Sequence, residues 1–348
     1  MFGFHKHDQR KKSMPLMIFR VFLSLTMFLV LALVALQAYR SFSGEDSLDI
    51  IQVLKSFKND PKATIITLIT SDASLKGLTG FVQQTGVQVP GVEKLVSPPS
   101  EDFESGLTPS GKILFKFAIV SDSHNENEYL AKALSQAGSE GARFVVGLGD
   151  WTATGTTAEL ESAKSVFEHS GLPYYLTAGD HDLWDSRDKG LTPDNKFNTI
   201  FGSTYQSFVD SNIRFVILFN SDNYEGMDVL QLEWLRETLE KAENSGQKVL
   251  VFAHEPLSHP TSDRVMGKDN QKLADQIAEV LAVLKSGSVT GVFAGNIHAF
   301  SQYQDTKSGL KMVTVGAVSG ERNVQSPRFL LVDLYENGGY NVKDLEIK

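Results

Sequence analysis

The stretch from Lys112 to His124 constrains the fold of this chain most strongly, because an apolar run ends abruptly in polar residues of types that can bind metal ions. Its sequence is KILFKFAIVSDSH, in which seven apolar residues are interrupted only by Lys116. A continuous apolar run rich in Phe, Ile and Val predicts a strand that is buried on both faces of a sheet. Side chains two positions apart on an extended chain point the same way, so we expect Asp122 and His124 to leave the strand end together. A carboxylate beside an imidazole is a common start of a divalent metal site.

After this stretch, apolar strands alternate with helices along the chain. Such alternation predicts an α/β fold whose ligands bind beyond the carboxyl ends of the strands. We expect a loop from residue 183 to about residue 207. The predicted strands are 143–148, 173–177, 213–219, 248–253, 289–294, 312–315, 329–334 and 340–344, and the predicted helices are 128–137, 157–168, 230–242 and 271–284.

Residues that bind metals or transfer protons follow five of these strands. Each has an ordinary explanation when taken alone: Asp150 as a turn residue, for example, or His254 as a histidine packed in the core. Together, at the same end of a sheet, they predict a site. A glycine precedes three of them, where we expect the backbone to turn sharply. The residues are Asp122, His124, Asp150, Asp180, His181, His254, Asn296 and His298.

The order of these motifs resembles that of the calcineurin-like metallophosphoesterases. The motifs are DSH at 122–124, GD at 149–150, GDHD at 179–182, the histidine at 254 and GNIH at 295–298. The resemblance covers roughly residues 112–321. The segment QLEWLRETLEKA at 231–242 is similar to the branch that holds purple acid phosphatases and class III cyclic-nucleotide phosphodiesterases. The resemblance implies two β-sheets packed face to face, helices outside them, and a two-metal centre at one edge.

The resemblance also implies a role for each residue at the strand ends. A metal-activated hydroxide would attack a phosphate mono- or diester held between two divalent ions. His181 would protonate the leaving oxygen or stabilise developing charge. The first metal would take Asp122, His124 and His298, Asp150 would bridge both metals, and the second metal would also take Asp180, His254 and Asn296.

The sequence departs from the family pattern at two of these positions. Asp180 stands where the family has asparagine, and Asn296 stands where it has histidine. Both changes make the second site richer in oxygen, which suits Mn²⁺, Mg²⁺ or iron better than Zn²⁺. The alternative is an anchored binding or scaffold protein without catalysis, or a protein with one metal and a degenerate second site.

The N-terminal region predicts a membrane anchor. Residues 21–39 contain no charge, and the basic residues Lys6, Arg10, Lys11, Lys12 and Arg20 precede them or stand at their start. Such asymmetry predicts a cytoplasmic N-terminus and an extracytoplasmic catalytic domain. A cleaved signal peptide is the competing interpretation, because residues 36–38 resemble a cleavage site. We therefore expect a basic tail at 1–15, a single-pass signal anchor at 16–39, a juxtamembrane segment at 40–96, a linker at 97–111 and the phosphoesterase domain at 112–348.

The composition limits the partners and the metal ligands. The net charge is −9 and no strongly basic segment follows the first 20 residues, so we expect no nucleic-acid partner. The chain contains no cysteine, so a metal must be held by histidine, carboxylate or amide groups. The expected partners are a phosphate ester substrate and the membrane; the sequence does not indicate an oligomeric state.

Overall fold

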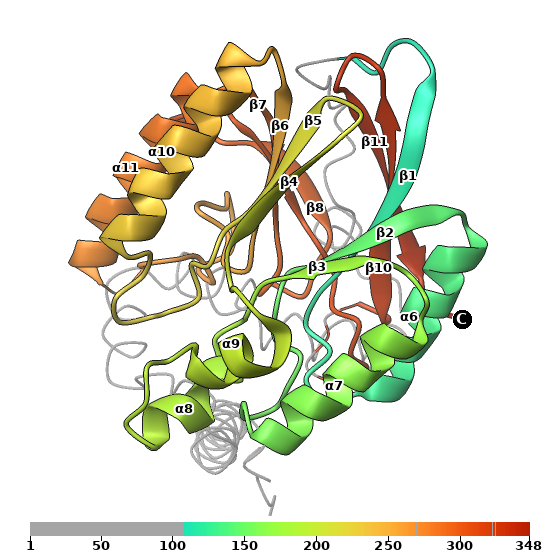
Figure 1. Cartoon of the computed structure of the whole chain (residues 1–348), viewed down its shortest axis with the longest axis vertical. Helices are drawn as coiled ribbons and strands as arrows, with labels where there is room; N and C mark the ends of the chain where they lie inside the picture. Colours follow the sequence, from blue (N-terminus) through green and yellow to red (C-terminus); the bar gives the residue numbers. More distant parts are fainter. Residues whose placement is uncertain (1–107, 269, 322, 324) are drawn as a thin grey trace, which may run out of the picture. The chain divides into compact units, whose positions relative to one another are not determined.

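Two mixed β-sheets lie face to face, with helices on the outer face of each (Figure 1). The architecture comes from a computed structural model, which describes residues 108–348 except 269, 322 and 324. The first sheet has the strand order β11-β10-β1-β2-β3, and the second has the order β4-β5-β6-β7-β9-β8. These two sheets with flanking helices confirm the predicted α/β fold class.

In the first sheet, β1 is central and its polar end leads into the predicted site. It pairs in parallel with β2, which pairs in parallel with β3, while β10 is antiparallel to β1. The carboxyl ends of β1, β2 and β3 therefore meet at one edge of the sheet. The strands are β1 (Ile113–Val120), β2 (Ala142–Gly147), β3 (Tyr174–Leu176), β10 (Arg328–Tyr335) and β11 (Tyr340–Glu346).

The second sheet has a parallel centre and antiparallel edge strands. Strands β5, β6, β7 and β9 are parallel neighbours, and β4 and β8 close the two edges in the opposite direction. The carboxyl ends of β6 and β7 therefore share an edge as well. The strands are β4 (Gln206–Asp210), β5 (Ile213–Ile217), β6 (Lys248–Ala253), β7 (Val289–Ala294), β8 (Ser301–Gln304) and β9 (Lys311–Thr314).

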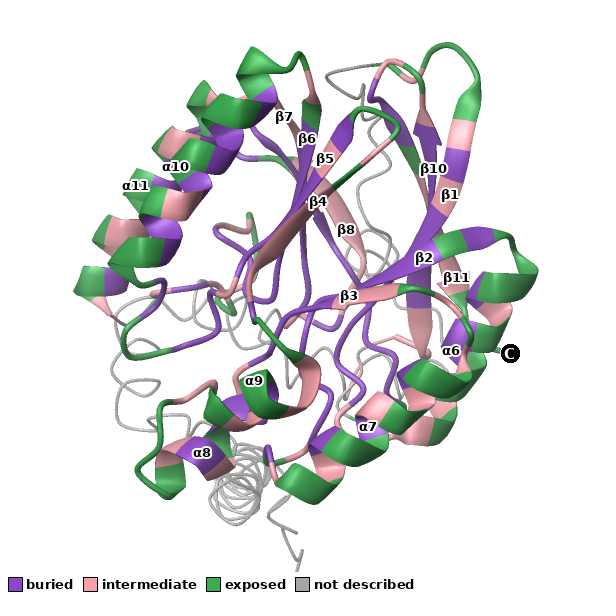
Figure 2. Ribbon diagram, viewed as in Figure 1, coloured by how far each residue is buried: buried purple, intermediate pink, exposed green. Residues whose placement is uncertain are grey.

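Aromatic rings from both sheets form the layer between them. Phe117 of β1 has no exposed surface and stacks on Phe144 of β2 at 5.4 Å between ring centroids. Its ring also meets Phe215 of β5 edge-on at 5.4 Å and Phe252 of β6 at 6.1 Å. Most residues of β1, β2 and β6 are buried, as Figure 2 shows, because helices cover the outer sides of the two sheets. This explains why β1 is almost continuously apolar.

The helices cover the sheets with apolar faces of helical spacing. On the second sheet, α10 buries Leu232, Leu235 and Leu239, and its first turn is capped by Asp228, which accepts a hydrogen bond from Gln231 N–H. On the first sheet, α6 and α7 enclose a second core. The helices are α6 (Asn127–Ser139), α7 (Thr157–His169), α8 (Trp184–Asp188), α9 (Asn195–Phe201), α10 (Val229–Asn244) and α11 (Gln271–Ser286).

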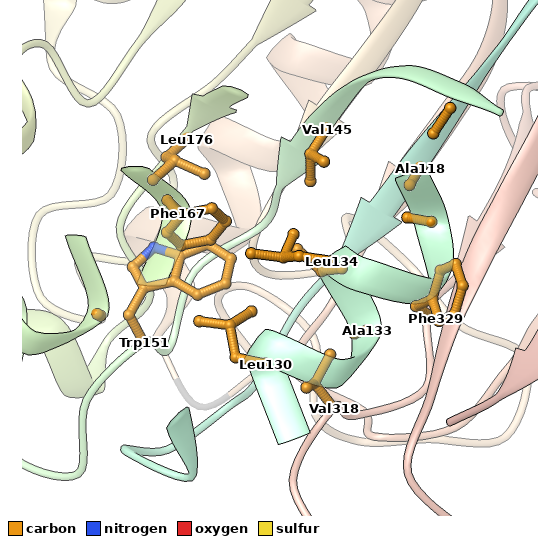
Figure 3. Packing of buried hydrophobic residues seen from close by; sticks show 14 of the residues in the cluster. Ala118, Leu130, Ala133, Leu134, Val145, Trp151, Phe167, Leu176, Val318 and Phe329 are labelled. Carbon is orange, nitrogen blue, oxygen red and sulfur yellow. The ribbon is translucent and has the colours of Figure 1, made fainter. Parts of the chain in front are cut away.

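The core under α6 and α7 reaches as far as the predicted site. Trp151, which follows the candidate ligand Asp150, packs edge-on against Phe167 of α7 at 5.0 Å (Figure 3). Leu130 and Leu134 of α6 lie beside the indole ring. The indole N–H also donates a hydrogen bond to the carbonyl of Thr177. The loop that carries Asp150 is therefore anchored in the core by its next residue.

The structure corrects one expectation about the main domain. The segment 183–207 was predicted to be a loop, but it contains α8, α9 and the first residues of β4. The strand β8 was not predicted either. These elements are short, and β4 and β8 carry polar, half-buried residues at sheet edges, so they lack the long apolar runs of the central strands.

The predicted membrane segments cannot be compared with this fold. The predicted tail 1–15, anchor 16–39 and juxtamembrane segment 40–96, and most of the linker 97–111, lie outside the described residues. In the part of the chain that the structure describes, no helix is both long and apolar enough to cross a bilayer.

The aromatic layer between the sheets makes a testable contribution to stability. Replacing Phe117 by alanine leaves a cavity among buried rings, and we expect it to lower the free energy of unfolding by about 3–5 kcal/mol. Ile113→Ala is the matched control, because Ile113 lies on the same strand with 47% of its surface exposed. Chemical denaturation of both variants measures the difference, and equal midpoints would contradict this account of the core.

Candidate metal centre

The loops that follow β1, β2, β3, β6 and β7 converge at the common edge of the two sheets. The loop after β1 runs beside the loop after β2, because Asp122 N–H donates to the carbonyl of Gly149 at 3.0 Å and His124 N–H donates to that of Asp150 at 2.9 Å. From the other sheet, the ring of His254 donates from Nδ1 to the carbonyl of Leu148 at 2.8 Å. Backbone and side-chain hydrogen bonds thus hold the candidate residues in one place.

One group of candidate ligands consists of Asp122, His124 and His298. The two Nε2 atoms of His124 and His298 are 3.2 Å apart, and His298 Nε2 is 3.4 Å from Asp122 Oδ1. One potential ligand atom from each of the three residues lies within 4.8 Å of the others. The backbone of Asn296 joins this group, because its N–H donates to the carboxylate of Asp122. Three donors that face one point suit a single divalent ion.

A second group lies on the other side of Asp150. His254 Nε2 is 3.6 Å from Asp150 Oδ1 and 3.5 Å from Asp180 Oδ1. His254 is fully buried, and Asp180 has only 18% of its side chain exposed. Among the described residues, His254 Nε2 has no hydrogen-bond partner. The group therefore has a buried nitrogen donor that faces two carboxylates.

Asp150 faces both groups at once with different oxygen atoms. Its Oδ2 is 3.7 Å from His124 Nε2 in the first group, and its Oδ1 is 3.6 Å from His254 Nε2 in the second. A carboxylate that presents one oxygen to each of two neighbouring positions has the geometry of a bridging ligand. The structure thus arranges the candidates as two half-sites around Asp150.

The electrostatics of this edge favour a bound cation. Burial raises the pKa of Asp150 well above its ordinary value, and the carboxylates of Asp180 and Asp122 raise it further, against the attraction of His254. For His254, burial alone would lower the pKa, but the nearby carboxylates raise it well above its ordinary value. Without a metal, protons must balance the buried negative charge. A divalent ion replaces those protons, so the residues present fit a metal site.

Comparison with known proteins identifies the family. A model of the family described as calcineurin-like phosphoesterase matches residues 115–300, which is more than half of the chain. The chain belongs to the calcineurin-like phosphoesterase family. The family description agrees with the predicted phosphoesterase chemistry, and the clustered Asp and His residues of the chain indicate a divalent metal site.

One relative in sequence and two solved structures are similar to this chain. A probable glycerophosphodiester phosphodiesterase GpdQ of Arcobacter nitrofigilis is 27% identical over 166 residues, which are 45% of this chain and 57% of the relative. The match thus spans less than two thirds of that relative's length. A dimetal phosphatase from Danio rerio has a TM-score of 0.50 at 20% identity, covering 68% of this chain and 99% of that one. The purple acid phosphatase PPD1 from yellow lupin (Lupinus luteus) seeds has a TM-score of 0.51 at 14% identity, and the match covers 70% of this chain and 53% of that one. At these identities the two structures show a shared fold.

The backbone of the phosphoesterase site is held in an unusual conformation. Left-handed φ values cost of order 1–3 kcal/mol each and persist only where the surroundings hold them. Asp, Asn and His tolerate this conformation better than most residues. This left-handed conformation also corrects the expectation that Asp122 and His124 point the same way on an extended chain, because neither residue continues the strand. The candidate ligands with positive φ are Asp122 (58°), His124 (44°), Asp150 (59°), Asn296 (61°) and His298 (60°).

The glycines before the candidate ligands serve two different purposes. Gly149 has φ 107° and turns the backbone, as the sequence predicted. Gly179 lacks a positive φ, but a Cβ atom there would lie 2.0 Å from Asp150 Oδ1. Gly179 is therefore required for the close approach of the loops after β2 and β3.

His181, the predicted catalytic residue, is buried next to two candidate ligands, His124 and Asp150. Its backbone N–H donates to Asp150 Oδ1 at 3.0 Å, and its ring Nδ1–H donates to the carbonyl of Ala153 at 2.8 Å. The ring meets His124 edge-on at 4.7 Å and stacks on Trp184 at 3.9 Å. Because Nδ1 is used by the carbonyl, a proton for the substrate would be carried by Nε2. The structure brings all eight predicted residues to one edge; the roles assigned to them stay predictions.

Asp182 holds the centre of the site together and was not assigned a role from the sequence. It is fully buried, and its Oδ2 accepts hydrogen bonds from the N–H groups of Asp150 at 3.0 Å and Gly179 at 2.9 Å. Its Oδ1 accepts from both the N–H and the hydroxyl of Thr152. Burial raises the pKa of Asp182 to about 6. The sequence feature that could have pointed to Asp182 is its place as the last residue of the GDHD motif.

Asn220 has a similar bracing function in the second sheet. Its Oδ1 accepts hydrogen bonds from the N–H groups of His254 and Glu255, both at 3.1 Å, and its Nδ2 donates to the carbonyl of Glu255 at 2.7 Å. The side chain therefore fixes the backbone at the end of β6, where His254 begins the loop. Asn220 follows β5, which makes this a sixth strand end with a polar residue that contributes to the site.

His259 links the loops that follow His254 and His298. Its Nδ1 accepts a hydrogen bond from Ser262 N–H at 2.8 Å, so its Nε2–H donates to Ser301 Oγ at 3.1 Å. Burial lowers the pKa of His259 to about 4, which keeps the ring neutral at physiological pH. In turn, the Ser301 hydroxyl is 2.7 Å from that of Thr314. His259 thus joins the loop after His254 to the start of β8.

The contacts of Asp182 give a test of the metal centre that does not depend on catalysis. In Asp182→Asn, the amide NH₂ would face either the N–H groups of Asp150 and Gly179 or the N–H and hydroxyl of Thr152. Either orientation sets hydrogen-bond donors against donors. We expect it to weaken metal affinity roughly 10- to 100-fold and to lower the free energy of unfolding by about 1–3 kcal/mol. Equilibrium dialysis followed by elemental analysis measures the first effect, and denaturation measures the second. Asp188→Asn is the control, because Asp188 is exposed on α8; equal metal content in both variants would contradict the bracing role.

Proposed function

We propose that this chain is a membrane-anchored, two-metal phosphoesterase that hydrolyses a phosphate mono- or diester without a covalent intermediate. The observation that carries the two-metal proposal is the position of Asp150, whose two oxygens face His124 and His254 in different groups. A site for one ion would not need a buried carboxylate between two sets of histidines. The family membership supports the reaction class.

The residues of the site have different roles in the proposed reaction. Bound divalent ions supply Lewis acidity, which activates a water molecule and neutralises charge on the phosphoryl oxygens. Asp122, His124 and His298 would hold the first ion, and Asp180, His254 and Asn296 would hold the second, with Asp150 shared between them. His181 holds a proton at Nε2 for the leaving oxygen, and the carbonyl of Ala153 fixes its ring for this task. Trp184 covers one face of that ring.

The metal preference that we propose rests on the donor set of the second position. Asp180 contributes a carboxylate that lies 3.5 Å from His254 Nε2. With Asp150 and the amide of Asn296, oxygen donors outnumber the single nitrogen donor. Such a set favours Mn²⁺, Fe or Mg²⁺ over Zn²⁺.

A phosphodiester is the substrate class with the most support. The relative from Arcobacter nitrofigilis is named a probable glycerophosphodiester phosphodiesterase. Its sequence match covers only part of both chains, so we propose the diester as a class and leave the alcohol groups open. Monoesters belong in the same test, because two metal ions can bind the oxygens of either substrate.

We test the reaction with the purified full-length chain and a panel of aryl phosphate mono- and diesters, each with Mn²⁺, Mg²⁺, Fe²⁺ or Zn²⁺. We expect Mn²⁺-dependent hydrolysis that EDTA abolishes, because the buried carboxylates need a cation. Asp150→Asn removes the central negative charge, and we expect a loss of at least about 10³-fold in kcat; for His181→Ala we expect about 10²- to 10⁴-fold.

The control for these variants is His169→Ala. His169 is exposed at the end of α7, where its ring contacts the carbonyl of Ser165, so its loss should leave kcat unchanged. Elemental analysis of the same samples counts the metals. One ion per chain with full hydrolysis would overturn the two-metal proposal, and equal inactivity of wild type and variants across all metals would favour a scaffold without catalysis.

The membrane location is a separate part of the proposal and rests on the N-terminal sequence. Residues 21–39 are uncharged, and the basic residues gather before them or at their start. These features support a retained anchor with the phosphoesterase domain outside the cytoplasm.

Cell fractionation tests the anchor. We expect the full chain to stay in the membrane pellet after an alkaline carbonate wash, and external protease to digest the domain in intact spheroplasts. A variant that lacks residues 1–39 should lose membrane attachment. A soluble product shortened at its N-terminus would instead indicate a cleaved signal peptide, and protection from external protease would overturn the orientation.

A further inference from the structure

One face of the edge strand β8 holds the loop that follows β6. Ser301 and Tyr303 of β8, and Asp305 directly after it, are two positions apart along the chain, so their side chains point the same way. The Tyr303 hydroxyl donates to the carbonyl of Ser258, and Asp305 Oδ1 accepts from Ser258 Oγ at 2.7 Å. Ser301 Oγ lies 3.1 Å from His259 Nε2. Three neighbouring contacts therefore fix this loop to the strand.

Hydrogen bonds lead from His259 across β8 and β9 to the backbone after His298. Ser301 Oγ, which His259 contacts, lies 2.7 Å from Thr314 Oγ1, and the two residues are partners in the antiparallel pair of β8 and β9. The hydroxyl of Thr314, which is fully buried, donates to the carbonyl of Ala299 at 2.7 Å. We name His259, Ser301 and Thr314 the polar relay. It ends one residue after the candidate ligand His298.

The two ends of the polar relay require the same direction of hydrogen bonding. A carbonyl oxygen only accepts, so the one proton of the Thr314 hydroxyl is used by Ala299, and Thr314 Oγ1 accepts from Ser301. The Ser301 proton is then used as well, so Ser301 accepts from His259 Nε2–H. At the other end, His259 Nδ1 accepts from the N–H of Ser262 at 2.8 Å, which also places the ring proton on Nε2. Only one tautomer of the neutral ring therefore fits.

The surroundings of His259 favour this neutral form. Burial lowers the pKa of His259 to about 4, so the ring is neutral at physiological pH. A protonated ring would point a donor at the N–H groups of Thr261 and Ser262, which lie 3.2 and 2.8 Å from Nδ1. The Tyr303 ring also packs edge-on against the imidazole at 4.8 Å. The fold thus selects the form that the polar relay requires.

The segment that the polar relay reaches depends on such support. His298 has a left-handed φ of 60°, a conformation that persists only where its surroundings hold it. After His298, the carbonyl of Ala299 accepts from Thr314, and the N–H of Phe300 donates to Gln325 Oε1 at 3.1 Å. These two hydrogen bonds fix the backbone that directs the His298 ring, and the polar relay supplies one of them.

We propose that His259 is a positioning residue for the candidate ligand His298. It acts through the hydroxyls of Ser301 and Thr314 and binds neither the ion nor the substrate itself. This inference rests on the proposed role of His298 as a ligand of the first ion, but metal binding can be measured without catalysis. Because His259 lies in the loop that follows His254, the polar relay also connects the loops that carry ligands of the two ions.

Two substitutions of His259 separate the polar relay from the loop turn. His259→Gln keeps an N–H near the position of Nε2, so it can still donate to Ser301. His259→Asn keeps an acceptor near Nδ1 for Ser262 but does not reach Ser301. We expect His259→Asn to weaken the binding of one Mn²⁺ ion roughly 10-fold, the lower end of the range for residues that orient a metal ligand, and His259→Gln to stay close to wild type. Equilibrium dialysis of the purified full-length chain over a series of Mn²⁺ concentrations, followed by elemental analysis, measures the affinity.

Thr314 gives the same test at the other end of the polar relay. Thr314→Val has a similar shape but no hydroxyl, so the carbonyl of Ala299 loses its donor, and we expect the same binding step to weaken by a similar factor. Thr314→Ser keeps the hydroxyl and should stay close to wild type. The double variant with His259→Asn and Thr314→Val should bind little more weakly than either single variant, because both break one relay. The Thr314 pair carries the test if His259→Asn fails to fold.

The weakened step should belong to the first ion. Asp180→Ala removes a carboxylate that only the second ion would use, so the binding step that it leaves unchanged identifies the first ion. Unchanged Mn²⁺ affinity in His259→Asn and Thr314→Val, or equal losses in His259→Asn and His259→Gln, would overturn the positioning role. Lower stability in denaturation at unchanged Mn²⁺ affinity would overturn it as well, because His259 would then support the fold alone.

Hydrolysis separates this inference from the proposed function. If the chain hydrolyses aryl esters but His259→Asn and Thr314→Val bind Mn²⁺ as wild type does, the positioning role is wrong and the phosphoesterase proposal stands. If these variants lose Mn²⁺ affinity as expected but the wild-type chain hydrolyses no ester, the positioning role stands and the proposed function fails.

Discussion

The burial of negative charge at the common edge of the two sheets is the constraint on which the rest of the site depends. Asp122, Asp150 and Asp182 are nearly or fully buried, and Asp180 is largely so. Such carboxylates persist in a folded core only when positive charge or several hydrogen-bond donors surround them. Asp182 is satisfied by backbone and hydroxyl donors, whereas Asp150 faces the ring nitrogens of His124 and His254. These different surroundings distinguish Asp182, which holds the loops together, from Asp150, which is a candidate bridging ligand.

This arrangement requires backbone conformations that would be unfavourable elsewhere. Five of the candidate ligands have positive φ values, and Gly179 passes too close to Asp150 for any larger residue. The strain is held by hydrogen bonds between loops of different strands, such as those from Asp122 and His124 to the loop after β2. The large cores on both sides of the first sheet supply the rigidity, since Trp151 anchors one loop directly in the packed interior (Figure 3). Packing, strain and ligand geometry thus form a single connected system.

The surroundings of the centre add a second level of organisation. His259 joins the loops after His254 and His298, and Asn220 fixes the end of β6. His181 links the centre to the partly exposed Trp184. Residues outside the candidate ligand set therefore determine how rigid the ligands are and which group can lie beside them. This distribution is typical of sites where loops on a rigid scaffold carry specificity.

The sequence by itself predicted the α/β class, the central strands and the eight residues that the structure brings to one edge, because long apolar runs and their polar ends are local features. It did not predict β4, β8, α8 or α9, whose short and polar segments are stabilised by contacts with distant neighbours. It also gave the wrong reason for the convergence of Asp122 and His124, which leave β1 in left-handed conformations and not as alternating strand residues. Only the tertiary structure showed that Asp150 turns its two oxygens to different histidines, that Asp182 and Asn220 hold the loops, and that the partly exposed Trp184 stacks on His181. These properties depend on distances between segments far apart in the chain, which local patterns do not encode.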